Sequence, residues 1–299
     1  MFTFRYHVVS LAAVFVALVV GILVGIGISG RGFVDKSERR QLQNQIDDLR
    51  NQRDDLGTQL AASQQRQKLA QAYVASTYRA VMSERLRGKG IAVLFVGHVD
   101  PAIRANIDDM LVAADAPAVL RMRALKTPVD PAALDAALAK RPAFAQYAGA
   151  GKLKDLGRAL GDEFVTGGDT PLWTALSVQL VEERTGPPRR PADGVVVVRS
   201  SGPQQGPTAL FLTGLYAGLA AAGVPVVGVE TTRTKPSAVP VYARVRRFSS
   251  VDDVDINEGR LALALLLAGA NPGHYGVKQS ASTDYLPAVD PLPVATTSG

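Results

Sequence analysis

Few side chains in this sequence are suited to binding a soft metal, and they lie far apart. The 299 residues include three histidines, four methionines and no cysteine. Copper(I) prefers thiolate or thioether ligands, and copper(II) prefers imidazole. His98, Met110 and Met122 are the residues we consider as metal ligands. No His-x-His, His-x₃-His or Met-x₃-Met spacing accompanies them, so packing is the more ordinary role for both methionines.

The sequence also gives little support for nucleophilic catalysis. Catalysis by a serine needs a base beside its hydroxyl group. Ser200 and Ser201 follow one apolar run and His98 follows another, but no GxSxG motif surrounds either serine. The connection RSSGPQQGP matches neither a GxGxxG fingerprint nor a Walker loop. We therefore predict that the protein is not an enzyme, and the residues themselves predict no cofactor.

An acidic turn precedes the last predicted helix. Asp252, Asp253 and Asp255 bring their carboxylates close together in the sequence. Carboxylate oxygens are ligands for hard cations such as Ca²⁺. The alternative is a solvated turn that leads into the helix, and this is what we expect here.

The chain is basic, with a formal net charge of +6. Basic proteins can bind nucleic acids, anionic lipids or other anionic polymers. The sequence contains no recognisable nucleic-acid-binding module and no interleaving of aromatic with basic residues. We therefore predict no nucleic-acid partner, and we interpret the charge as a basic surface near anionic lipid.

A long apolar segment follows a short N-terminal flank at residues 1–7. No charged residue occurs from Val8 to Ser29, and at about 1.5 Å per residue this run spans roughly 33 Å, enough for a hydrocarbon core of about 30 Å. A cleaved signal peptide would have a shorter apolar region and an Ala-x-Ala ending. We therefore predict an uncleaved signal-anchor helix at residues 8–29, and hence a single-pass membrane protein.

A coiled-coil helix is predicted at residues 35–87, after a hinge at residues 30–34. Isoleucine at a positions with leucine at d positions is typical of parallel two-stranded coiled coils. Small residues four apart in a membrane helix let two helices approach closely. An ordinary solvated helix is the alternative. We predict a parallel homodimer whose interface contains the glycine pair Gly21 and Gly25 and the heptad residues Leu42, Ile46, Leu49, Arg53, Leu56 and Leu60.

Residues 88–276 alternate between apolar runs and helical patterns. Strands that are covered on both faces are continuously apolar, and repeated strand–helix–strand units predict a mostly parallel sheet. The predicted fold class is therefore α/β, with a Rossmann-like three-layer domain and a disordered tail at 277–299. Strands are predicted at 91–96, 118–125, 195–200 and 224–230, and helices at 101–114, 131–140, 170–183, 208–222 and 258–268.

Three segments of the chain resemble the MctB family of copper transport proteins. They are the opening RYHVVSLAAVFVALVVGILVGIGI, the following QLQNQIDDLRNQRDDL and the closing SSVDDVDINEGRLALALLLAGANPGHYG. The resemblance implies a protein of the bacterial cell envelope that takes part in copper homeostasis or export, with copper as the one metal implied. It also implies an outer-membrane channel. A membrane barrel needs alternating strands of about 9–11 residues, and the strand runs here are continuous and separated by helices.

A second function remains open beside copper transport. The order of an anchor, a coiled coil and a domain is also that of a dimeric scaffold which recruits or regulates cell-wall or division factors. This alternative calls for a protein partner in the envelope or in the cytoplasm. Positive residues lie on both sides of the anchor, so the sequence leaves open which side of the membrane the domain faces.

Overall fold

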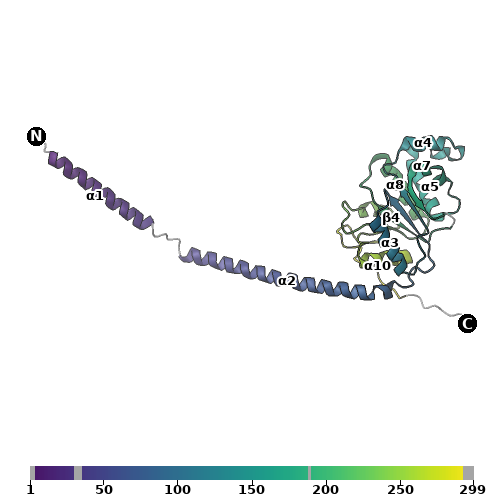
Figure 1. Ribbon diagram of the computed structural model, residues 1–299. Coiled ribbons are helices and arrows are strands. Elements are labelled where there is room, and N and C mark those ends of the chain that lie inside the picture. Colours follow the sequence, from purple (N-terminus) through teal and green to yellow (C-terminus); the bar gives the residue numbers. More distant parts are fainter. Residues whose placement is uncertain (1–3, 30–35, 188–189, 292–299) are drawn as a thin grey trace. The chain divides into compact units, whose positions relative to one another are not determined.

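The structure is a computed structural model that describes residues 4–29, 36–187 and 190–291 (Figure 1). The chain divides into two compact units, residues 1–70 and residues 71–299. The hinge predicted at residues 30–34 lies outside the described residues.

Helices make up the described part of the first unit. Helix α1 (Phe4–Ser29) contains the predicted anchor, and its stretch His7–Ile26 is long and apolar enough to cross a membrane. Helix α2 (Lys36–Met82) begins in this unit and ends in the second one. The predicted helix at 35–87 is therefore formed as a single helix with a slightly earlier end.

The second unit contains a sheet of seven strands in the described residues, in the order β3-β2-β1-β4-β5-β6-β7. Every neighbouring pair is parallel except β2 with β3. This confirms an α/β fold with a mostly parallel sheet. The strands are β1 (Ile91–Val96), β2 (Arg121–Leu125), β3 (Val181–Thr185), β4 (Gly194–Arg199), β5 (Val226–Val229), β6 (Phe248–Val251) and β7 (His274–Tyr275).

Apolar residues fill both faces of this sheet. In β1, Ile91, Val93 and Phe95 belong to one core, and Ala92 and Leu94 belong to the other, because successive side chains of a strand point to opposite faces. Figure 1 shows helices on either side of β4. The first core is covered by the end of α2, α3 (Pro101–Ala113) and α10 (Asn257–Ala268), and the second by α4 (Pro131–Ala139), α5 (Leu153–Thr166), α6 (Pro171–Ala175), α7 (Ser177–Leu180), α8 (Gly206–Ala221) and α9 (Val239–Tyr242).

Helices α3 and α4 begin with the same short sequence, an aspartate followed by a proline. The Asp100 carboxylate accepts hydrogen bonds from the backbone N–H groups of Ala102 at 2.9 Å and Ile103 at 3.1 Å, and Asp130 caps α4 in the same way. The missing N–H of proline costs nothing in the first turn. The start of each helix is therefore determined by its local sequence. Helix α3 begins at residue 101, as the sequence predicts.

Several elements differ from the sequence prediction, which also lacks the short helix α9 and the strands β6 and β7. The helix expected at 170–183 is divided into α6 and α7, and the chain then forms the edge strand β3 from Val181, because pairing with the free edge of β2 outweighs local helical preference. Helix α5 was not predicted. The ordered chain also extends past the boundary predicted at residue 277, since Lys278 forms an ion pair with Glu230.

Candidate functional site

The carboxyl ends of β1 and β4 meet where the sheet reverses its winding order, which is the usual ligand site of open α/β sheets. Here the two connections are in close contact. The hydroxyl group and the N–H of Ser201 both donate to the carbonyl of Val96 at 3.0 Å. Gly97 has φ +108, and a Cβ atom there would lie 2.9 Å from the N atom of Ser201. The two connections are therefore packed directly against each other at this point.

The neighbouring carboxyl ends of β5 and β6 carry a buried polar network. Glu230 is 2% exposed, and its carboxylate accepts from the Nζ of Lys278 and from the N–H of Ala238, both at 2.7 Å. The ammonium group of Lys278 also donates to the carbonyls of Thr231 at 2.7 Å and Thr234 at 3.0 Å. This ion pair fixes the segment that follows β7 across the end of β5.

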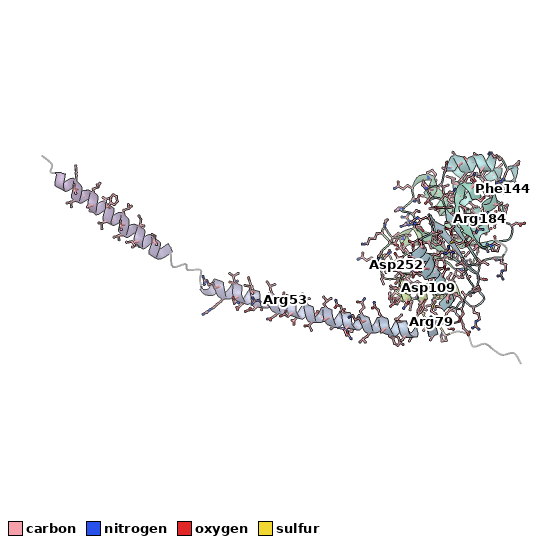
Figure 2. All side chains as sticks on the ribbon, viewed as in Figure 1. Arg53, Arg79, Asp109, Phe144, Arg184 and Asp252 are labelled. Carbon is pink, nitrogen blue, oxygen red and sulfur yellow. The ribbon has the colours of Figure 1, made fainter. Side chains whose placement is uncertain are left out.

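Asp252 fixes the same segment from the end of β6. It is fully buried, and its carboxylate accepts from the backbone N–H groups of Val277 at 2.9 Å and Lys278 at 3.2 Å (Asp252 is labelled in Figure 2). Burial raises the pKa of Asp252, while these two hydrogen bonds act in the opposite direction. The solvated turn that the sequence suggested is therefore a buried connection.

Asp253 has the most unusual environment of the described acidic residues. It is 1% exposed, and neither carboxylate oxygen has a hydrogen-bond partner among the described residues. Burial raises its pKa to about 7, and the charges of Asp252, Asp255 and Glu258 act in the same direction. Asp255 is engaged elsewhere, since it accepts from the N–H and the hydroxyl of Thr232 at 2.8 and 2.7 Å. Burial and the neighbouring acidic groups therefore bring the pKa of Asp253 close to neutral pH.

The three residues proposed as copper ligands lie in different environments. His98 is exposed just beyond β1. Met110 and Met122 are 0% and 2% exposed and belong to the apolar core under α3 and α10. Within the described residues, no three His, Cys, Asp or Glu side chains are grouped so that they could hold a metal ion. The structure therefore adds no ligand set to the sequence prediction.

Met122 also lines a half-open cavity of about 360 Å³ between α3 and strands β1 and β2. Its other lining is mostly apolar and includes Phe95, Ile107 and Leu111. Such a volume is within the range of small-molecule pockets. No periodicity in the sequence indicates this cavity, because its walls come from separate elements that only the folded sheet brings together.

The residues proposed as a dimer interface are exposed in the single chain. Leu42, Leu49, Leu56 and Leu60 are 57–65% exposed, and Ile46 is 43% exposed. Apart from the chain neighbours and the backbone of their own helix, no described atom lies within 4 Å of where a Cβ atom on Gly21 or Gly25 would be. Figure 2 shows the side chain of Arg53 extending from α2. These surfaces are therefore open to a partner.

The chain is similar over nearly its whole length to one family of proteins. The family model described as "Copper transport outer membrane protein, MctB" matches residues 1–285. Two relatives, each called "Copper transporter MctB", come from Mycobacterium bovis and Mycobacterium tuberculosis. Each is 26% identical over 326 residues of alignment, which cover 94% of this chain and 98% of the relative. Since the family model spans the apolar helix α1, the long helix α2 and the α/β domain, the chain belongs to the MctB family.

Proposed function

We propose that this protein is a membrane-anchored protein of the cell envelope that serves copper homeostasis or export. The observation that carries the proposal is the match of the copper transport family model to residues 1–285. The apolar stretch His7–Ile26 supports a single-pass, uncleaved anchor. The exposed heptad residues of α2 support a parallel dimer held by a coiled coil.

In this proposal the protein contributes to copper transport through assembly with other components rather than as the pore itself. A single membrane helix, or a pair of them, lines no obvious channel. The Rossmann-like domain would then present a surface to a partner protein. Ion conductance by the purified protein alone, reconstituted into vesicles with and without copper, would contradict this assignment.

The first experiment compares total cell copper in a deletion strain and in its complemented parent, both grown in raised copper. We expect excess copper and normal cell shape in the deletion strain, with both restored by complementation. Unchanged copper together with misshapen or chained cells would instead identify the dimeric scaffold of cell-wall or division factors as the function.

Complementation with point variants then tests the proposed ligands. His98→Gln removes an exposed imidazole without disturbing the core. The matched control is His274→Gln, because the Nδ1 of His274 already interacts with the hydroxyl of Ser250 at 2.9 Å. Failure of His98→Gln alone to restore cell copper would support a ligand role for His98, whereas full restoration by both variants would exclude it.

A further inference from the structure

Two arginines of strand β2 are buried without a carboxylate partner. Arg121 is 1% exposed and Arg123 is 7% exposed. An Nη of Arg121 donates to the carbonyl of Arg190, and its Nε and other Nη have no hydrogen-bond partner among the described residues. Arg123 donates to the carbonyls of Met122 at 2.8 Å and Thr185 at 3.2 Å. Both guanidinium groups are thus removed from water and neutralised by nothing more than carbonyl dipoles.

A third arginine lies next to this pair. Arg184 of the edge strand β3 is the direct partner of Arg123, so its side chain lies on the same face of the sheet. Arg121 and Arg123 also share a face, because they are two residues apart in one strand. Burial lowers the pKa of Arg123, and the positive charges of Arg184 and Arg121 lower it further. Arg184 itself is exposed and is labelled in Figure 2.

Neither acidic residue of β3, Glu182 or Glu183, forms an ion pair with this cluster in the described part of the chain. Glu183 pairs with Arg104 of α3 at 3.5 Å, which places it on the opposite face of the sheet. Among the described residues, no ion pair involves any of the three arginines of the cluster. The two nearby positions outside the description are Pro188 and Arg189, which carry no carboxylate. A buried charge that lacks a counter-charge is unfavourable, so an anion from solution would stabilise this arrangement.

We propose that Arg121, Arg123 and Arg184 form a binding site for a phosphate-type dianion. Guanidinium groups match the geometry of phosphate oxygens and can donate two hydrogen bonds to each ligand. A phosphate monoester carries about −1.5 to −2 charges at neutral pH, which suits a group of three positive charges better than a single carboxylate does.

Thermal unfolding of the full-length protein in detergent tests this site. Trp173, the single tryptophan, is 4% exposed in the core on the same face of the sheet, so its fluorescence reports the domain. Inorganic phosphate and glycerol 3-phosphate are titrated separately at constant ionic strength with chloride. We expect phosphate to raise the Tm in a saturable manner, because a ligand that binds only the folded state stabilises it. A rise with both anions indicates a phosphomonoester ligand, and a rise with inorganic phosphate alone indicates free phosphate.

Variants separate binding from a structural role. In Arg123→Met we expect the Tm without phosphate to stay equal or to rise, since a buried uncompensated charge is removed, and the phosphate-dependent rise to disappear. Arg184→Gln changes an exposed residue and should weaken phosphate binding about tenfold without unfolding the domain. Arg246→Gln, which removes an exposed arginine after α9, is the matched control and should bind as the parent does.

Two results would overturn the proposal. One is an equal phosphate-dependent rise in all four proteins, because excluded kosmotropic anions stabilise any fold. The other is a lower Tm for Arg123→Met without phosphate together with an unchanged response of Arg184→Gln, which would make these arginines structural. Neither result bears on copper transport, so this site can fail while the proposed function stands.

Discussion

The carboxyl group of Asp253 shows how position in the fold changes the chemistry of a single side chain. The ordinary pKa of an aspartate is 3.8, and burial with neighbouring acidic groups raises that of Asp253 to about 7. Between these two pH values, Asp253 is therefore protonated in the folded protein and ionised in the unfolded chain. The stability that comes from this proton is fully present below pH 3.8 and is lost as the pH rises through about 7.

Asp253→Asn removes this ionisation while keeping the size of the side chain. We expect the Tm of the variant to exceed that of the parent at pH 8 and the difference to shrink toward pH 4, because each pKa unit corresponds to about 1.4 kcal/mol. Asp169→Asn, which changes an exposed aspartate just before α6, serves as the control for the loss of one negative charge. A difference for Asp253→Asn that is independent of pH would disprove the buried ionisation.

The ion pair between Glu230 and Lys278 permits a second prediction for individual residues. Lys278→Met leaves the carboxylate of Glu230, which is 2% exposed, without its cation. Such a loss destabilises a fold by about 3–5 kcal/mol, whereas a neutral pair in the same space costs far less. Urea unfolding followed by Trp173 fluorescence should therefore show a large loss for Lys278→Met and substantial recovery in the double variant with Glu230→Gln. A fully stable Lys278→Met would mean that residues past 277 contribute little to the domain.

Among the elements of the domain, helices α5 and α8 make an unusually close contact. Gly157 and Gly161 of α5 lie against the backbone of Phe211, Leu215 and Leu219. Gly214 and Gly218 of α8 lie in turn against the carbonyls of Lys154 and Arg158. Glycine at four-residue spacing on both helices lets the two backbones touch, as in membrane helix pairs.

A methyl group in this contact has no room, so Gly157→Ala and Gly218→Ala should each destabilise the domain by about 3 kcal/mol, the upper end of what overpacking costs. The obstacle is backbone, which cannot rotate away as a side chain would. Gly151→Ala is the matched control, since no atom lies within 4 Å of the added Cβ atom. The measurement is the urea midpoint of each purified variant, and equal midpoints for Gly151→Ala and Gly157→Ala would rule out the close packing.

These glycines also explain which elements the sequence could reveal. Strand β1 and the start of α3 follow from an apolar run and an Asp–Pro cap, which are local signals. Helix α5 is not predicted because Gly157 and Gly161 lower the helical preference of its sequence. These glycines allow close packing against α8, which is far away in the sequence and comes near only in the folded domain. The burial of Asp252 was also hidden, because the residues that cover it follow β7 and come close only in the folded domain.

At the scale of the whole molecule, the long helix α2 poses the question of oligomeric state. Leu42, Leu49 and Leu56 lie seven residues apart, and each is more than half exposed. A helix that stays single in water gains no stability from such a stripe of leucines. A parallel partner would bury this stripe, and Arg53 at an a position would disfavour other registers. In such a dimer, the two copies of α1 would lie next to each other in the membrane, and each would be linked to one α/β domain.

The absence of cysteine from this chain makes the dimer directly testable. In a parallel, in-register coiled coil, the two residues at the same d position of the two chains face each other at the axis. Their Cα atoms are then within the range of roughly 4.4–6.8 Å that a disulfide bond spans. We expect full-length Leu49→Cys in native membranes to form a disulfide-linked dimer on mild oxidation. Asn51→Cys, two residues away on the outer surface of the proposed coil, should remain monomeric on a non-reducing gel. Equal cross-linking at both positions would indicate random collisions, and none at Leu49 would leave α2 as a single solvated helix. Only the selective result supports a dimeric envelope protein whose two domains act together.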